Sequence, residues 1–115
     1  MGEFSCRDKD NIEIVCSDDC WENHITAEHP EMMGWEAYVK TTIENPYQIY
    51  QDGRHPKRKT YYRPFILPKP FHTQYLRVVV EYRKRRFRGV RGYVVTSFPC
   101  QGIREGDILI WESRM

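Results

Sequence analysis

Residues 78–95, VVVEYRKRRFRGVRGYVV, contain two runs of β-forming residues joined by a short, arginine-rich connection. A connection this short between two such runs predicts an antiparallel hairpin. The hairpin constrains the fold strongly, because its apolar face has to pack against another layer of the protein. In the first strand, residues with a period of two separate into an apolar face (Leu76, Val78, Val80, Tyr82) and a mixed face (Arg77, Val79, Glu81).

The rest of the chain divides into a helical first part and a strand-rich second part. Capping and periodicity predict helices at about 18–29 and 31–44, the second with Pro30 at its start. A short strand is expected at 11–17, and the period changes to two from Tyr47 onward, with a last short strand near 106–111. We therefore expect an α+β domain in which a short N-terminal strand and two helices pack on one face of a roughly four-stranded antiparallel sheet.

The length of 115 residues is typical of one domain, which we expect to span residues 11–115. Residues 1–10 are expected to form a disordered or vector-derived tail. No apolar run is long enough for a membrane span or a secretory signal, so we predict a cytoplasmic protein, and we expect a monomer.

The charges are distributed very unevenly along the chain. The first 52 residues hold 12 acidic and 3 basic residues, whereas residues 53–104 hold 14 basic residues and one acidic residue, Glu81. Such an asymmetry favours a polyanionic partner for the basic half, although two halves that simply neutralise each other are the alternative.

Aromatic residues are interleaved with these cations, as in proteins that bind phosphates electrostatically and stack on unpaired bases. No predicted helix carries the charge, which favours RNA over duplex DNA as the partner. The residues predicted to bind RNA are Arg58, Lys59, Arg83, Lys84, Arg85, Arg86 and Arg88.

The sequence contains no pattern typical of a paired-carboxylate metal site or a bound cofactor, so we expect neither. Cys16, Cys20 and His24 recur every four residues, but a zinc site would need a fourth ligand, and free buried thiols are the simpler interpretation. RNA cleavage without a metal needs a base, an acid and cations around the phosphate.

Several side chains are suited to those roles. His24 is a candidate base or acid, because imidazole groups in general change charge near neutral pH, although a core histidine beside Trp21 is the alternative. Arg63 and Arg58 suit the cationic role, and Tyr62, Thr96 and Ser97 suit hydrogen bonding to phosphate oxygens. Glu81 is either a base or an ion-pair partner.

The ordered series WENHITAEHPEM, TTIENPYQIY, TYYRPF, LRVVVEY and GYVVTSF resembles the phage-type branch of the barnase–EndoU–colicin–RelE-like nucleases over about residues 11–111. The resemblance implies a metal-independent ribonuclease, of a group that includes toxins and phage-borne effectors, with its active site on an open sheet face. It assigns catalytic roles to His24, Arg63, Thr96 and Ser97. His55 and His72 lie in predicted loops and are second-choice acid–base candidates.

The function that we expect is an endoribonuclease that uses 2′-hydroxyl attack and leaves a 2′,3′-cyclic phosphate. The alternative is a non-catalytic RNA-binding domain that uses the same basic face. A toxin of this kind is expected to have an acidic antitoxin or immunity protein as a partner.

Overall fold

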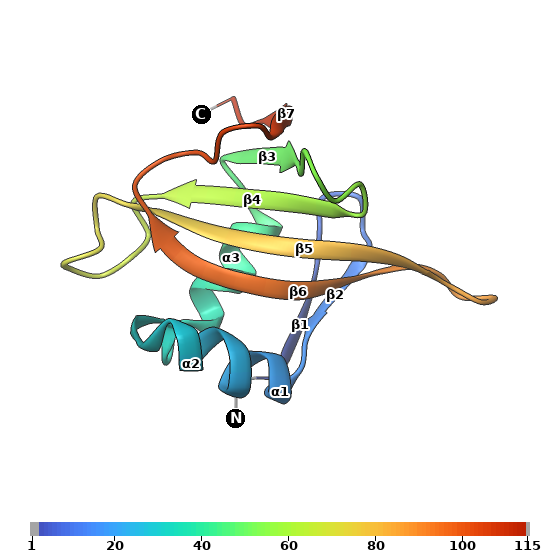
Figure 1. The fold of residues 1–115 in the computed structure, drawn as a ribbon, viewed down its shortest axis with the longest axis horizontal. Helices are drawn as coiled ribbons and strands as arrows, with labels where there is room; N and C mark the ends of the chain where they lie inside the picture. The colour runs from blue at the N-terminus through green and yellow to red at the C-terminus, as the bar shows by residue number, and fades with distance from the viewer. Residues whose placement is uncertain (1–2, 115) are drawn as a thin grey trace.

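The computed structural model describes residues 3–114, which form one seven-stranded sheet with helices on one side (Figure 1). The strand order is β1-β2-β6-β5-β4-β3-β7, and every neighbouring pair is antiparallel except β2 and β6, which are parallel. The strands are β1 (Phe4–Arg7), β2 (Glu13–Cys16), β3 (Gln48–Gln51), β4 (Arg58–Pro64), β5 (Tyr75–Arg85), β6 (Gly89–Cys100) and β7 (Ile108–Glu112).

The predicted α+β class is confirmed, but the sheet is larger than the four antiparallel strands that we expected, and it is mixed. The short strands expected at 11–17 and near 106–111 are present as β2 and β7 and join the same sheet, whereas β1 was not expected. β1 is only four residues long, so it carries a weak periodic signal. Residues 4–7, assigned above to a tail, form β1. Asp8 stabilises the turn that follows, because its buried carboxylate accepts hydrogen bonds from the N–H groups of Asp10 and Ile12, each at 2.9 Å.

The first helical segment joins α1 (Asp18–Cys20), a π-helical turn η1 (Trp21–Ile25) and α2 (Thr26–Glu28). Ser17 caps its beginning, because the Ser17 hydroxyl accepts a hydrogen bond from the N–H of Cys20 at 3.1 Å. The second predicted helix begins later than expected. Residues Pro30–Met32 form a 3₁₀ turn (η2), and α3 spans Glu36–Glu44. Gly34 lies between them with φ of +83°, a left-handed conformation that interrupts a helix and suits glycine.

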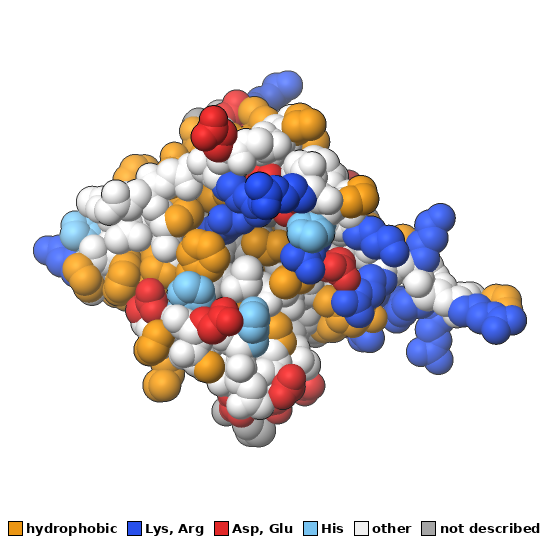
Figure 2. Space-filling model, viewed as in Figure 1, with side chains coloured by type: hydrophobic (Ala, Val, Ile, Leu, Met, Phe, Trp, Pro, Cys, Tyr) orange, Lys and Arg blue, Asp and Glu red, His pale blue; other side chains and the backbone are white. Residues whose placement is uncertain are grey.

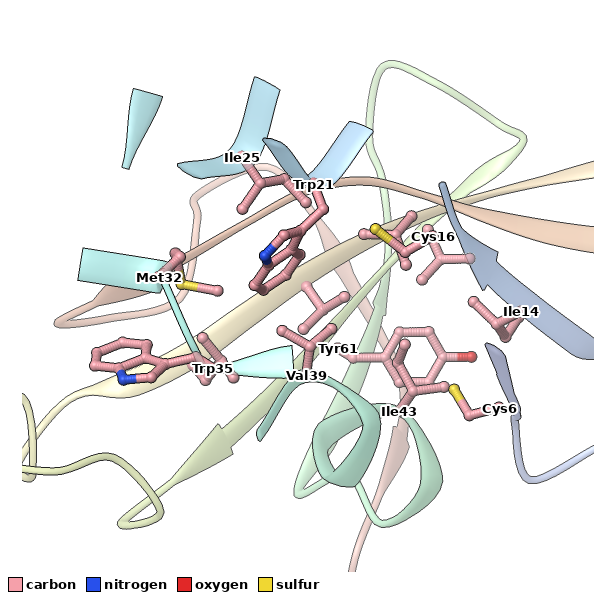
Figure 3. Close-up of a cluster of buried hydrophobic side chains, with 14 of the residues drawn as sticks. Cys6, Ile14, Cys16, Trp21, Ile25, Met32, Trp35, Val39, Ile43 and Tyr61 are labelled. Carbon is pink, nitrogen blue, oxygen red and sulfur yellow. The ribbon is translucent and has the colours of Figure 1, made fainter. Parts of the chain in front are cut away.

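The hydrophobic core lies between the helices and one face of the sheet (Figure 3). Burial of these side chains supplies most of the favourable free energy of folding. β6 approaches β2 closely at Gly92, where a Cβ atom would collide with the side chains of Ile14 and Val80. The largest contributors to the core are Trp21, Ile25, Met32, Trp35, Val39 and Ile43 from the helical part and Ile14, Ile49, Tyr61, Leu76, Val78 and Val80 from the strands.

The β5–β6 hairpin projects beyond the rest of the sheet (Figure 1). The pairing between β4 and β5 ends where Arg58 faces Glu81, whereas β5 continues to Arg85 and pairs there only with β6. At the tip, Phe87 has φ of +65° and is 94% exposed. No helix among residues 3–114 is long and apolar enough to cross a membrane.

Candidate nucleic-acid interface

The helices cover only one face of the sheet, and the other face, here called the open sheet face, carries the polar groups of the three longest strands. The register places these side chains in cross-strand rows, since residues directly opposite one another point to the same side. Figure 2 views the molecule from this side and shows Lys and Arg side chains over the middle of the sheet and along the projecting hairpin. The three rows are Tyr62–Arg77–Phe98, Thr60–Val79–Thr96 and Arg58–Glu81–Tyr93.

A β-bulge in β6 determines which of two predicted site residues reaches this face. The register shifts between Val79 and Val80, which pair with Thr96 and Val94, so Val95 is the additional residue. As a result Thr96 lies on the open sheet face, whereas Ser97 points to the core. Ser97 is fully buried, and its hydroxyl donates to the carbonyl of Arg77 at 2.8 Å. The side chains of Thr96 and Ser97 therefore lie on opposite faces of the sheet, and only Thr96 can contribute to a site on the open sheet face.

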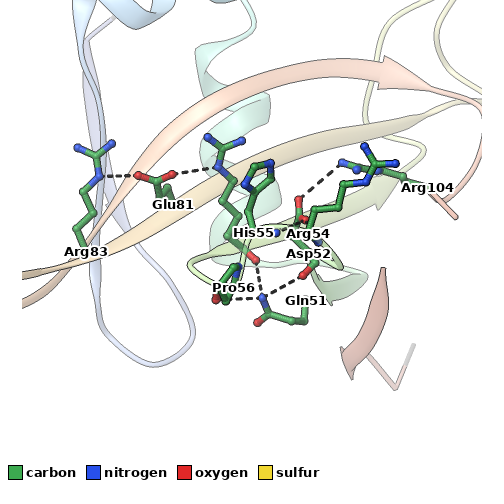
Figure 4. Close-up of polar contacts among 9 residues, drawn as sticks. Gln51, Asp52, Arg54, His55, Pro56, Glu81, Arg83 and Arg104 are labelled. Atoms are coloured by element: carbon green, nitrogen blue, oxygen red, sulfur yellow. Dashed lines mark hydrogen bonds and ion pairs between the residues drawn. The ribbon is translucent and has the colours of Figure 1, made fainter. Parts of the chain in front are cut away.

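Glu81 is held between two guanidinium groups on the open sheet face. Nε of Arg58 lies 3.0 Å from Oε1, and Nε of Arg83 lies 2.6 Å from Oε2 (Figure 4). The hydrogen bonds from Arg83 and Arg58 hold the pKa of the Glu81 carboxyl below its ordinary value. Arg83 also lies over the ring of Tyr93, with 5.1 Å from Cζ to the ring centroid. The arrangement keeps a carboxylate ionised beside two cations that can bind a phosphate.

The β3–β4 loop holds His55 next to this cluster. The buried Asp52 carboxylate accepts hydrogen bonds from the N–H groups of Arg54 (2.7 Å) and His55 (2.8 Å). The N–H of Arg58 donates to the carbonyl of His55 at 3.0 Å, so a closed turn connects the histidine to the first residue of β4. In the view of Figure 4 the His55 ring is drawn between Glu81 and Arg104.

The Asp52 carboxylate stabilises the β3–β4 loop and is not available as a general acid. Its burial would raise its pKa, but the N–H groups of Arg54 and His55, together with the Arg104 guanidinium 3.7 Å away, outweigh burial and lower it. The N–H of Arg104 in turn donates to the hydroxyl of Tyr62 at 3.3 Å. Tyr62 is on the open sheet face but is fully buried, and its hydroxyl is bonded to the backbone of the β6–β7 loop, so it is not accessible to a ligand.

The expectation that Arg63 shares a face with Thr96 is wrong. Arg63 faces Leu76, a core residue, and therefore points to the helix-covered side of the sheet. Its guanidinium donates to the carbonyl of Asn45, which follows α3, at 2.6 Å. The physical reason is alternation along β4, because the neighbouring Tyr62 occupies the open sheet face.

His24 lies in η1, and its side chain is 45% exposed. Its Nδ1 is 3.7 Å from the Glu28 carboxylate one turn later. It is therefore not a buried core histidine, but the structure does not bring it to Arg63. His72 is exposed in the loop between β4 and β5.

His29 is a residue that the sequence analysis did not propose for the site. Its ring packs on that of Phe98 with 4.7 Å between the centroids, and the guanidinium of Arg77 lies 5.2 Å from the same Phe98 ring. Phe98 is two residues from Thr96 on β6, so His29 and Arg77 extend the open sheet face at that end. No local pattern links His29 to Phe98, because the contact depends on how the end of α2 meets the sheet.

The predicted RNA-binding cations fall into three groups. Arg58 and Arg83 lie on the open sheet face around Glu81, whereas Lys59 and Lys84 face the opposite side, where their register partners are Val80 and Val90. The third group occupies the hairpin tip and consists of Arg85, Arg86 and Arg88.

All four cysteines are free thiols. The thiol of Cys20 donates to the carbonyl of Val94 at the β6 bulge, with 3.1 Å between the sulfur and the oxygen. Among residues 3–114, no three His, Cys, Asp or Glu side chains are arranged to hold a metal ion.

No protein-family model, curated protein or solved structure matches this chain.

Proposed function

We propose that the protein is a metal-independent endoribonuclease whose reaction centre is Glu81 on the open sheet face. The observation that supports this most strongly is the placement of one ionised carboxylate between Arg58 and Arg83, where the backbone N–H of Arg58 is bonded to the turn that carries His55. These are the groups that transfer of an RNA phosphate to its own 2′-oxygen requires, namely a base, an acid and cations around the phosphate.

In this mechanism the Glu81 carboxylate removes the proton of the 2′-hydroxyl. The 2′-oxygen then forms a bond to phosphorus, and the bond from phosphorus to the 5′-oxygen breaks. The His55 imidazolium donates a proton to the departing 5′-oxygen. The products are a 2′,3′-cyclic phosphate and a new 5′-hydroxyl end, and Arg58 and Arg83 stabilise the additional negative charge on the phosphorus oxygens in the transition state.

The low pKa of Glu81 in the absence of RNA is consistent with this role. An incoming phosphate competes with the carboxylate for the guanidinium groups of Arg83 and Arg58, which are the groups that lower its pKa. When they move to the phosphate, the pKa of Glu81 rises toward its ordinary value and the carboxylate becomes a stronger base.

Other parts of the open sheet face suit a bound RNA chain. Thr96 offers a hydroxyl to a phosphate oxygen, and Phe98 with His29 offers aromatic surface for a base. The cations of the hairpin tip extend the surface away from the reaction centre, where they neutralise phosphates of the same strand.

A second candidate function is RNA binding without cleavage. It is favoured by the fact that both oxygens of Glu81 already have a guanidinium partner, as in a purely structural ion pair. In either case, an acidic antitoxin or immunity protein would be attracted to the same cationic face, and action on cellular RNA would require the protein in the cytoplasm.

The experiment that tests the proposal is incubation of the purified protein with transfer, ribosomal and messenger RNA in the presence of EDTA, followed by analysis of the new ends. Cyclic phosphate ends support the proposal. Intact RNA at all protein concentrations, together with measurable RNA binding, would favour the second function.

A further inference from the structure

A second cationic site lies behind the hairpin, on the side of the sheet opposite Glu81. It is a cavity of about 590 Å³, here called the hairpin pocket. Four of the eight residues that line it are basic and none is acidic. The lining residues are Ile12, Pro56, Lys57, Lys59, Tyr82, Arg83, Lys84 and Val90.

Apart from Arg83, which also binds Glu81, the strand residues that line the hairpin pocket point away from the reaction centre, because neighbouring residues of β5 alternate between the two faces. Glu81 points to the open sheet face, so Tyr82 and Lys84 point to the opposite one. Lys59 reaches the same side from β4, where its register partner is the core residue Val80.

The aromatic wall of the hairpin pocket is rigidly held. The Tyr82 hydroxyl donates to the Asp8 carboxylate at 2.8 Å and is also hydrogen-bonded to the Tyr61 hydroxyl at 2.5 Å. The N–H of Tyr82 donates to the carbonyl of Lys57 at 2.7 Å. Since Asp8 is buried and is itself fixed by the β1–β2 turn, the ring has little freedom to move, and a ligand would pay a small entropic cost to order this wall.

The lysines of the hairpin pocket are not neutralised. Arg83 is paired with Glu81, but Lys57, Lys59 and Lys84 make no ion pair within the described residues 3–114. The Lys59 ammonium lies 5.0 Å from the centroid of the Tyr82 ring, which holds one positive charge at the aromatic wall. Several cations gathered in one cavity repel one another, and an anion with more than one charge relieves that repulsion.

We infer that the hairpin pocket binds a 5′-phosphorylated nucleotide. The ammonium groups of Lys57, Lys59 and Lys84 contact the phosphates, and the base or ribose packs against Tyr82, Ile12 and Val90. The volume lies in the range of roughly 300–1,000 Å³ that is usual for small-molecule sites. The nucleotide is either free in solution or the 5′ end of an RNA, and its binding does not depend on whether the open sheet face cleaves RNA.

Calorimetric titration tests the inference with four probes: adenosine triphosphate, adenosine monophosphate, adenosine and a short 2′-O-methyl RNA. The RNA is used with and without a 5′-phosphate and lacks the nucleophile for cleavage. The affinity is expected to rise with the number of phosphates, so that adenosine triphosphate binds most tightly and adenosine most weakly. The double variant Lys59→Ala/Lys84→Ala should weaken binding about tenfold or more, as for loss of hydrogen bonds to charged groups.

The matched control is Lys40→Ala/Lys69→Ala, which removes the same charge outside the hairpin pocket and should change the affinity less than about twofold. Circular dichroism verifies that both variants are folded. If the wild type and the control variant bind adenosine triphosphate and the Lys59/Lys84 variant does not, the ligand is a free nucleotide. If adenosine triphosphate does not bind, but a 5′-phosphate strengthens RNA binding and the Lys59/Lys84 variant loses this gain, the ligand is an RNA end.

Two results overturn the inference: neither adenosine triphosphate nor a 5′-phosphate on the RNA gives tighter binding than the matching probe without phosphate, or the two double variants lose affinity equally. A Glu81→Gln variant separates this inference from the proposed function, since it should keep nucleotide binding whether or not the wild-type protein cleaves RNA.

Discussion

The Glu81 carboxylate faces the Arg58 guanidinium across β5 and β4, with 3.0 Å between Oε1 and Nε, and Arg83 binds the other oxygen at 2.6 Å. The register of β4, β5 and β6 places the three side chains on the sheet face that the helices leave uncovered. This cluster, the proposed reaction centre, lies at the base of the cationic hairpin, because β5 continues from Glu81 directly into the projecting part of the hairpin.

If His55 is the general acid, the His55→Ala variant should reduce RNA cleavage by about 10²-fold or more, since general acid–base catalysis contributes on that scale. His72→Ala serves as the control, because His72 lies in another exposed loop. Cleavage rates of the wild type and the two variants at neutral pH provide the measurement. An equal loss of activity in His24→Ala and none in His55→Ala would transfer the role to His24.

Replacing the three tip residues Arg85, Arg86 and Arg88 by alanine should weaken RNA binding without unfolding the protein. Each lost phosphate contact should reduce the slope of log K against log salt by roughly 0.7, the value for single strands. The measurement is fluorescence anisotropy at several salt concentrations, with Lys69→Ala as the control. An unchanged slope would show that the tip does not contact phosphates.

Thr96 and Ser97 provide a test of the β6 bulge. Thr96→Ala should weaken RNA binding or cleavage and leave the stability nearly unchanged, because its side chain is on the open sheet face. Ser97→Ala should have the opposite effect, with a loss of about 1 kcal/mol in the free energy of unfolding, since it removes the buried hydrogen bond to Arg77. Urea denaturation and RNA binding of both variants measure the difference, and reversed effects would mean that the register is incorrect.

Asp52→Ala should destabilise the protein by about 1–3 kcal/mol at neutral pH, because the N–H groups of Arg54 and His55 lose their acceptor. The pKa of Asp52 is lower in the folded than in the unfolded chain, so its stabilising effect is fully present above the ordinary value of 3.8 and is lost as the pH falls through the lower folded value. Urea denaturation of wild type and variant should therefore show a stability difference that narrows below about pH 3.8. A difference that grows on acidification would contradict this assignment.

The long elements and most of the short strands could be predicted from the sequence, but β1 and the parallel pairing of β2 with β6 could not. β5 and β6 have strong alternation and the first helical segment has a clear Ser17 cap. In contrast, β1 is only four residues long and is stabilised by the contact of Asp8 with Tyr82, which are 74 positions apart. Contacts of this range leave no local pattern.

The candidate site was predicted in its charge but not in its geometry. The basic half of the chain correctly indicates a cationic sheet face and hairpin, but residue type alone does not show to which face a side chain points. Thus Arg63 and Ser97 point away from the open sheet face, the latter because of the additional residue Val95. His29 was missed because its partner Phe98 belongs to a distant strand.

The most direct test of the central claim compares the wild type with Glu81→Gln in an EDTA-containing cleavage assay, using Glu105→Gln, an exposed acid outside the site, as the control. We predict that the wild type and the control produce 2′,3′-cyclic phosphate ends. The Glu81→Gln variant should still bind RNA, but its cleavage rate should be lower by a factor of about 10² or more. If the wild type leaves RNA intact, or if Glu81→Gln cleaves as fast as the wild type, Glu81 is not the base of a ribonuclease.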